Sequence, residues 1–188
     1  MYPRIVNVVS TFNMNCKFNL KNLTNELFNI EYNPKKFGAA IMKLKSPRST
    51  ALIWHTGKIV VAGAASKEES RRSSRRYFKI IKKLGYDVKF SEFKIRNIVA
   101  TMDMKQYFGR AVSINVEHMA RTSPKKNNMN LWSFEPEIFP ALICKFSNMK
   151  ILVFKSAKII FSGAKNINQL YNAYDYLFPY LITNSIFK

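Results

Sequence analysis

Two cysteines and two histidines are the candidates in this chain for thiol or imidazole chemistry: Cys16, Cys144, His55 and His118. A structural zinc site needs four such ligands at close, paired spacings, and these four residues are scattered along the sequence. The chain also lacks the phosphate-binding pattern GxxxxGK[ST] and the HxE…CxxC pattern of zinc deaminases. We therefore expect no metal, no cofactor and no enzymatic activity, and we expect both thiols to pack as small hydrophobic residues.

Cationic residues dominate the charge of the chain. Its 188 residues include 31 Lys and Arg against 11 Asp and Glu, a net charge of +20, yet 47% are hydrophobic and 14% aromatic. A disordered basic tail does not carry that much apolar surface. The longest apolar stretches, such as 59–65, are far shorter than the roughly 20 residues of a membrane-spanning helix. The composition predicts a folded protein without membrane association that binds a polyanion.

The chain contains an internal repeat. The segment IVVAGA at 59–64 returns as IIFSGA at 159–164, and IVNVVST at 5–11 returns as IRNIVAT at 95–101. A repeat of this length is a whole α+β unit rather than a solenoid repeat. We therefore predict two related halves, residues 1–92 and 93–188. Because the offset grows from 90 to 100 residues, the second half should also contain an insertion, expected as a mobile surface loop around residues 121–130.

The two halves also predict the same order of elements. Each begins with a strand and a short helix, at residues 5–12 and 20–28 in the first half and 95–102 and roughly 111–119 in the second. Three or four strands and a long helix follow in each half. The first long helix should begin near Ser66, where SKEE matches a capping box, and should stop before Gly85. Its apolar residues recur at helical spacing, which indicates that it covers one face of an antiparallel sheet.

The opposite face of this sheet is apolar as well. Alternation puts Leu52, Trp54, Val60 and Ala62 on one side of the strands, and Ile53, Ile59 and Val61 on the other. A free sheet face is normally polar when helices cover only the other one. The pattern predicts a broad apolar strip, flanked by lysines, that serves as an interaction surface. The alternative is a second helix layer or a two-sheet sandwich, for which the chain has few helical segments.

Segments of both halves resemble the core of the TATA-box-binding protein (TBP) family. They include VNVVST, EYNPKKFGAAIM and GKIVVAGA in the first half and FEPEIFPALICKF and KIIFSGAK in the second, and the resemblance covers residues 3–182. It implies an α+β fold, a pseudo-twofold saddle in which a curved antiparallel sheet of about ten strands carries four helices on its convex face. It also implies that the concave face binds the minor groove of A·T-rich promoter DNA and kinks it with inserted aromatic side chains, a mechanism for which this family is the reference example.

The resemblance assigns roles to individual residues. The inserted aromatic wedges are expected to be Phe37, Trp54, Phe139 and Phe154. The minor-groove base contacts are expected to be Asn7, Val9, Leu52, Val60, Asn97, Val99, Leu152, Ile160 and Ser162. The phosphate contacts are expected to be Lys36, Lys43, Thr56, Lys58, Lys145, Ser156 and Lys158.

The resemblance also implies partners in transcription initiation. Residues Glu135, Glu137 and Ile138 match the surface on which transcription factor IIB docks. A basic face on the long first-half helix matches the surface that meets transcription factor IIA or a negative cofactor, and its residues are Arg71, Arg75, Arg76, Lys82 and Lys83. Further implied partners are TBP-associated factors. We expect a nuclear initiation factor that is monomeric on double-stranded DNA and nucleates the preinitiation complex, while the sequence leaves a dimer of the free protein open.

Two departures from the family pattern keep an alternative open. Trp54 stands where the main family has phenylalanine, and Ala62 replaces a groove-facing threonine whose counterpart in the second half is Ser162. Both changes are compatible with a diverged TBP-like factor that has weak TATA specificity and competes for general transcription factors. A third hypothesis is a base-flipping repair enzyme, since some glycosylases have a related saddle-like domain. That activity needs an acidic or lysine nucleophile in a pocket, and the sequence shows no such constellation.

Overall fold

The computed structural model of the protein describes residues 2–126 and 129–187. It divides into two compact units. The N-terminal unit is Val6–Asn97. The C-terminal unit joins Met1–Ile5 to Ile98–Lys188. The two units are defined by spatial contacts, whereas the predicted boundary between residues 92 and 93 separates two sequence repeats. That repeat boundary stays a prediction. Within the described ranges, no helix is both long and apolar enough to span a membrane.

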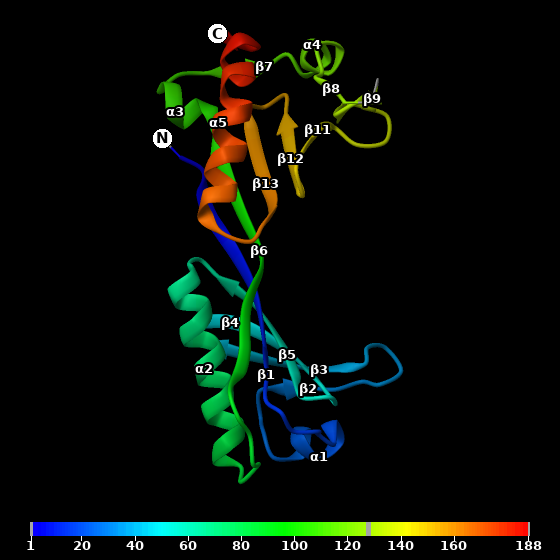
Figure 1. The fold of residues 1–188 in the computed structure, drawn as a ribbon, viewed down its shortest axis with the longest axis vertical. Coiled ribbons are helices and arrows are strands. Elements are labelled where there is room, and N and C mark those ends of the chain that lie inside the picture. Colours follow the sequence, from blue (N-terminus) through cyan, green and yellow to red (C-terminus); the bar gives the residue numbers. More distant parts are fainter. Residues whose placement is uncertain (1, 127–128, 188) are drawn as a thin grey trace. The chain divides into compact units, whose positions relative to one another are not determined.

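The N-terminal unit contributes five strands to a ten-stranded sheet and packs a long helix against them (Figure 1). In chain order its elements are β1 (Arg4–Asn13), α1 (Leu20–Asn25), β2 (Ile30–Glu31), β3 (Ala39–Lys45), β4 (Arg48–Trp54), β5 (Lys58–Ala64) and α2 (Lys67–Lys83). The strands are antiparallel and lie in the order β2-β3-β4-β5-β1. Helix α2 packs on β4 and β5.

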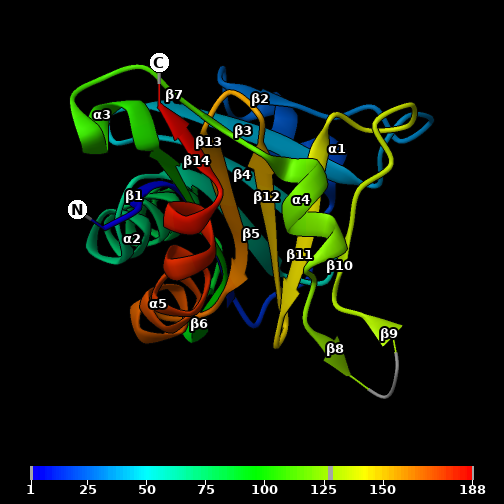
Figure 2. The same cartoon turned by 90° about the horizontal axis from the view of Figure 1, so that it is seen from above.

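The C-terminal unit repeats this arrangement with additional elements. Its elements, beginning with a strand that starts in the other unit, are β6 (Ser91–Asp103), α3 (Met104–Phe108), β7 (Val112–Ile114), α4 (Val116–Arg121), β8 (Lys125–Lys126), β9 (Met129–Asn130), β10 (Trp132–Ser133), β11 (Ala141–Phe146), β12 (Met149–Phe154), β13 (Lys158–Ala164), α5 (Ile167–Thr183) and β14 (Ser185–Phe187). Its sheet strands lie in the order β6-β13-β12-β11-β10. Helix α5 lies beside β13, and α4 lies beside β11 (Figure 2).

The two units share one strand register. In the N-terminal unit Leu52 lies opposite Val60, and in the C-terminal unit Leu152 lies opposite Ile160. Because side chains alternate between the faces of a strand, equal registers place equivalent residues on the same face of each half-sheet. The predicted fold class, α+β with about ten antiparallel strands, is confirmed.

A glycine occupies the irregular part of β5 and of β13, the strand before the long helix in each unit. The pairing of β5 with β1, and of β13 with β6, shifts next to Gly63 and Gly163, whose φ angles are +101° and +105°. A Cβ atom on Gly63 would lie 3.3 Å from Ser49 Cα, and one on Gly163 would lie 2.7 Å from the carbonyl oxygen of Asn148. The repeated Gly-Ala pair therefore marks a backbone position where a side chain would be both strained and crowded.

The long helices begin with the same kind of cap. The Glu69 N–H donates to Ser66 Oγ at 3.0 Å, and the Gln169 N–H donates to Asn166 Oδ1 at 2.9 Å. Each cap satisfies a backbone donor that the first helical turn leaves without an intrahelical partner. Helix α2 ends before Gly85, whose φ is +92°. The predicted start and end of this helix are confirmed.

Helix α2 covers one face of the N-terminal strands. Ile53, Ile59 and Val61 are fully buried together with Tyr77 of the helix. On the same strands Leu52 and Val60, which point the other way, remain partly exposed. Within the described residues of this unit no second helix layer or second sheet lies over that face. The predicted one-sided cover is confirmed.

The predicted helix at roughly 111–119 is wrong in its boundaries. The structure has α3 before it, strand β7 within it and α4 from Val116, so the described residues contain five helices rather than four. Asn115 explains the late start, because its Oδ1 accepts the His118 N–H at 3.0 Å and caps α4. Residues 112–114 pair instead with β14, with Ile114 opposite Ser185. Periodicity alone did not reveal this pairing partner at the other end of the unit.

The insertion around residues 121–130 contains two short strands that pair with each other. In β8 and β9, Lys125 lies opposite Asn130, while residues 127–128 lie outside the described part of the chain. At its base the Trp132 N–H donates to Ser123 Oγ at 3.0 Å, and the Leu131 N–H donates to the Pro124 carbonyl at 2.9 Å.

The crowding at Gly163 predicts a difference in stability. Gly163→Ala should lower the free energy of unfolding by about 1–3 kcal/mol more than Gly85→Ala, because both alanines are strained at positive φ but only the first meets backbone atoms. Urea unfolding of both variants measures this difference. Equal losses of stability would contradict the steric account, since no described atom lies within 4 Å of a Cβ built on Gly85.

Candidate nucleic-acid interface

The face of the N-terminal strands opposite α2 is an apolar strip. Val9, Leu52 and Val60 were predicted to lie on it, and all three are partly exposed and come from three neighbouring strands. Leu52 and Val60 are direct cross-strand neighbours, and Val60 lies opposite Thr11 on β1. The structure therefore brings residues from distant parts of the sequence into one continuous surface.

The C-terminal unit has a matching strip. Val99, Leu152 and Ile160 are partly exposed on its free face, and Ile160 lies opposite Thr101 of β6. Ser162 also lies on this face, opposite Lys150. The equivalent pair in the N-terminal unit is Ala62 opposite Thr50, so the hydroxyl on this strand is present in only one unit.

The strips include residues that were not predicted to lie there. Ile41 is the cross-strand neighbour of Leu52, and Ile143 is that of Leu152; both are partly exposed. Alternation along 39–45 and 141–146 is the signal that identifies them. Thr11 is different, because its Oγ1 accepts the Arg96 Nε–H at 2.9 Å and the residue is nearly buried.

The predicted wedge residues form one aromatic pair in each unit. The rings of Phe37 and Trp54 are 5.6 Å apart at 60°, and those of Phe139 and Phe154 are 6.2 Å apart at 65°. Phe37 is 40% exposed and Phe139 38%, which is high for phenylalanine. Each pair therefore presents apolar edges to solvent beside the apolar strip.

Equivalent turns and registers hold the two aromatic pairs. The Phe37 N–H donates to the Asn33 carbonyl at 2.9 Å, and the Phe139 N–H donates to the Glu135 carbonyl at the same distance. Trp54 lies opposite Ala39 in β3, as Phe154 lies opposite Ala141 in β11. In each unit, one ring thus comes from a turn and the other from the end of a strand.

A hydrogen bond fixes the amide of Asn7. The Gly63 N–H donates to Asn7 Oδ1 at 2.8 Å, so the acceptor side of the amide is occupied. The Nδ2 group is then the polar group of this side chain that remains for donation. Asn97 is half-buried on β6, the repeat-related position in the other half of the sequence.

The predicted phosphate contacts are all exposed, as a role in binding a polyanion requires: Lys36, Lys43, Thr56, Lys58, Lys145, Ser156 and Lys158. Thr56 lies in the turn after Trp54, and Ser156 lies in the turn after Phe154. Lys43 Nζ is 3.8 Å from Glu31 Oε1, and both side chains are mostly exposed. Such a long surface ion pair contributes little stability and leaves Lys43 available to another anion.

A second exposed surface lies on the turn before Phe139. Glu135, Glu137 and Ile138 are all exposed there, and Ile138 is 79% exposed. The Ile138 N–H donates to the Glu135 carbonyl at 3.0 Å, which fixes the turn. Two exposed carboxylates thus precede a protruding isoleucine in this turn.

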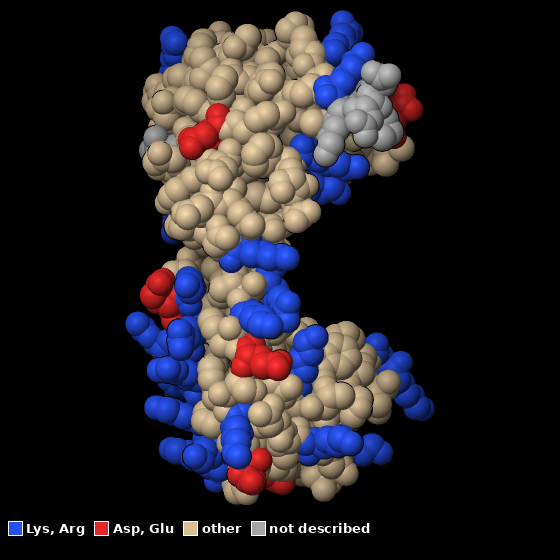
Figure 3. Space-filling view, in the orientation of Figure 1, with Lys and Arg blue, Asp and Glu red and all other residues tan. Residues whose placement is uncertain are grey.

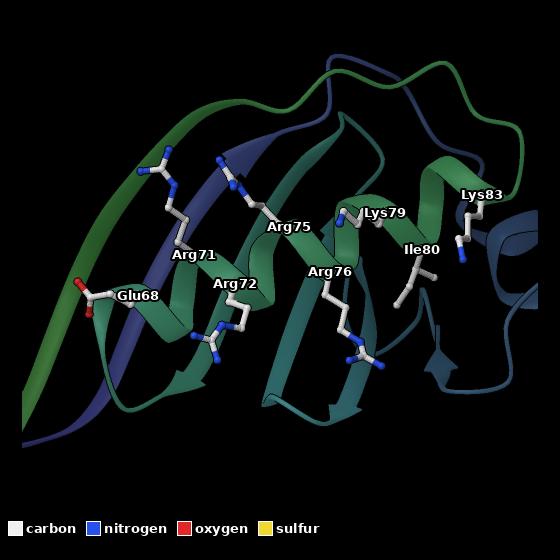
Figure 4. Close-up of a pocket in the computed structure, with 8 residues that line it drawn as sticks. All are labelled: Glu68, Arg71, Arg72, Arg75, Arg76, Lys79, Ile80 and Lys83. Carbon is white, nitrogen blue, oxygen red and sulfur yellow. The ribbon is translucent and has the colours of Figure 1, made fainter.

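A third surface is the basic groove along the exposed side of α2. Cationic side chains gather over this helix at the lower left of Figure 3. The groove is lined by Glu68, Arg71, Arg72, Arg75, Arg76, Lys79, Ile80 and Lys83. Figure 4 shows Arg71 and Arg75 projecting to one side of α2 and Arg72 and Arg76 to the other.

The basic groove includes four of the five residues predicted to meet an acidic partner, namely Arg71, Arg75, Arg76 and Lys83. Lys82 is exposed outside the groove, with its Nζ 6.0 Å from the centre of the Phe78 ring, and its partner-binding role stays a prediction. Arg72 and Lys79 belong to the groove although they were not among the predicted contacts. Helical spacing is the signal for them, because Arg72 lies four residues before Arg76 and Lys79 lies four residues after Arg75.

The residues with potential for catalysis do not assemble. Within residues 2–126 and 129–187, no group of three or more His, Cys, Asp and Glu lies close enough to hold a metal ion. Cys144 is buried, and this burial raises the pKa of its thiol. Cys144 is therefore a neutral packing residue at physiological pH.

Comparison with known proteins identifies the family. A family model described as "Transcription factor TFIID (or TATA-binding protein, TBP)" matches residues 2–84 and 92–183. The chain belongs to the TBP family. The resemblance that the sequence motifs indicated is thereby confirmed, and membership of a family of DNA-binding transcription factors supports the prediction that the chain is not an enzyme.

Relatives of the chain are named either TATA-box-binding protein or TATA-box-binding protein-like. The chain is 42% identical over 185 residues to TATA-box-binding protein 2 of Entamoeba histolytica, covering 97% of this chain and 82% of the relative. It is 38% identical over 182 residues to TATA-box-binding protein-like 1 of the same organism, covering 96% and 79%. It is 42% identical over 181 residues to the TATA-box-binding protein of Drosophila melanogaster, covering 95% of this chain but 48% of that protein.

A solved structure supports the TBP fold. The Methanococcus jannaschii TBP matches with a TM-score of 0.77 and 29% identity, over 94% of this chain and 96% of that one. The predicted fold is therefore confirmed at the level of the family.

Proposed function

We propose that this protein is a general transcription initiation factor that binds A·T-rich, TATA-type promoter DNA in the minor groove, kinks it and nucleates preinitiation complex assembly. The observation that carries the proposal is the pairing, in each unit, of an uncovered apolar strip with an exposed aromatic pair. An apolar surface of this kind gains free energy when it leaves water, and a widened minor groove offers it sugars and base edges.

The polar groups on the strip fit the minor groove of A·T pairs. There, A·T pairs present only acceptors, adenine N3 and thymine O2. The Asn7 amide supplies a donor, because its oxygen is already bound to Gly63. A guanine would place its N2 amino group against Val9, Leu52 and Val60, where the group would lose its hydrogen bonds to water. This exclusion supports a preference for A·T-rich sites.

Lysines and turn hydroxyls account for the affinity rather than the preference. Lys36, Lys58, Lys145 and Lys158 are exposed and approach phosphates as point charges, while Thr56 and Ser156 offer hydroxyl donors. Charges of this kind release counterions from DNA, so the binding constant should fall steeply with salt. The same lysines bind any duplex, and the apolar strip distinguishes between sequences.

We propose three kinds of protein partner. We propose that the turn carrying Glu135, Glu137 and Ile138 binds a factor of the IIB type. The basic groove on α2 is suited to an acidic partner of the IIA type or to a negative cofactor, because its arginines offer bidentate donors to carboxylates. TBP-associated factors are further partners, and the site of action is the nucleus. The protein acts as a monomer on DNA.

Trp54 and Ala62 favour one alternative, a TBP-like factor that reads TATA weakly and competes for general factors. Both residues change the strip of the N-terminal unit relative to that of the C-terminal unit. Selection of binding sites from random duplexes separates the two functions. Enrichment of an A·T-rich octamer supports the initiation factor, whereas binding of general factors without such enrichment supports the alternative.

Removal of the aromatic wedges should reduce DNA bending. Phe37→Ala, Trp54→Ala and the Phe139→Ala/Phe154→Ala double variant should each bend a TATA duplex less and bind it at least about tenfold more weakly, because inserted aromatic side chains keep the base step open. Energy transfer between dyes at the duplex ends measures the bend. Phe28→Ala is the control, because Phe28 is a fully exposed phenylalanine outside both strips. Undiminished bending in all three wedge variants would exclude the assignment.

Asn7→Asp should separate binding from folding. The aspartate still accepts the Gly63 N–H, so the unfolding free energy should change little, but it replaces the donor with an anion facing phosphates and acceptors. We expect affinity for a TATA duplex to fall about tenfold or more. Asn172→Asp adds the same charge at an exposed position on α5 and should bind nearly as the wild type. Similar losses in both variants would mean that charge alone, and not the Asn7 donor, sets the affinity.

A further inference from the structure

The two aromatic pairs differ by one hydrogen-bond donor. Trp54 and Phe154 occupy the same register, each opposite an alanine and each followed by a turn. A phenyl ring carries no polar atom, whereas the indole of Trp54 carries an Nε1–H that can donate but not accept. The aromatic pair of the N-terminal unit can therefore form a polar contact that its counterpart cannot.

The indole donor of Trp54 has no partner within the described part of the chain. Its side chain contacts the ring of Phe37 and lies beside Gly38. The side chain is half-buried on the free face of the strands. A tryptophan N–H in such a position normally finds an acceptor when it is removed from water.

Packing against Gly38 indicates which edge of the indole lies near the glycine. A Cβ built on Gly38 would lie 3.5 Å from Trp54 Cζ3, so the six-membered ring lies against the glycine. In an indole, Cζ3 and Nε1 belong to opposite long edges of the ring system. The N–H edge is therefore turned away from Gly38. The residue after Phe139 in the other unit is Pro140, so the glycine beside the aromatic pair is a feature of the N-terminal unit.

We propose that Trp54 is a specificity-determining residue whose indole N–H donates to a minor-groove acceptor, adenine N3 or thymine O2, at the base step next to the Phe37–Trp54 pair. The inference rests on the proposed binding to A·T-rich DNA. A guanine at that step would set its N2 amino donor against the indole donor, so the N–H adds discrimination that phenylalanine does not provide. At the other end of the site, the Phe139–Phe154 pair has no polar atom, so it can discriminate between base pairs by shape and stacking alone.

A double-mutant cycle between protein and DNA tests this contact. The protein is the full chain, as wild type or Trp54→Phe, which keeps an aromatic wedge but removes the donor. The DNA is a self-complementary TATATATA duplex or the same duplex with one acceptor deleted at the outermost steps. 3-Deazaadenine replaces N3 by C–H, and in a second duplex difluorotoluene removes thymine O2. Placement at both ends makes the result independent of the orientation of the protein.

The wild type should lose about three- to tenfold more affinity than Trp54→Phe on one of the two modified duplexes, the range expected for one hydrogen bond. Trp54→Phe should also tolerate an outermost G·C pair better than the wild type. Equal losses for both proteins on both duplexes, with binding and bending of the natural duplex intact, overturn the role of Trp54 and leave the proposed function standing. Failure of the wild type to prefer TATATATA over a G·C duplex overturns both.

Discussion

The structure depends on the one-sided cover of its strands. Every strand presents alternate side chains to opposite faces, and α2 covers one face of the N-terminal strands while Leu52 and Val60 remain on the other. At about 25 cal/mol per Å² of apolar surface, leaving this strip in water forgoes a substantial stabilisation. A second layer would recover that free energy within the protein. Its absence from the described residues of the unit leaves the surface for a partner, and the rims of lysine indicate that the partner is anionic.

Because both units repeat the same strands and long helix, equivalent positions can carry different side chains and make different contacts. Helices α2 and α5 have equal length and equivalent caps, yet α2 carries eight Lys and Arg residues while the only charged residue of α5 is Asp175. The strips differ more subtly, through Ala62 against Ser162 and Trp54 against Phe154. Strand register is the same in both units, and Gly63 and Gly163 occupy equivalent positions. Partner choice therefore lies in side chains that the shared core does not constrain.

The sequence predicts what depends on local periodicity and on repetition. The strand pairing around Leu52 and Val60, the cap at Ser66 and the apolar free face all follow from alternation, capping patterns and internal similarity. The helix near residues 111–119 was misplaced because β7 is a strand only through its pairing with β14, which lies about 70 residues away in the sequence. Which basic residues of α2 line the groove also required the structure, because the sequence does not show that Lys82 turns toward Phe78. The orientation of the Trp54 indole also required the position of Gly38, which sequence spacing alone does not give.

The most direct test of the account replaces the A·T pairs of a TATA duplex by inosine·cytosine pairs. Such pairs keep a minor groove without the guanine N2 amino group, but their major groove presents the pattern of G·C pairs. If the apolar strips contact the minor groove, the protein should bind the inosine duplex within a few-fold of the A·T duplex and the G·C duplex at least about tenfold more weakly. Loss of binding to the inosine duplex equal to that of the G·C duplex would contradict the account, because it would show that the major groove is read.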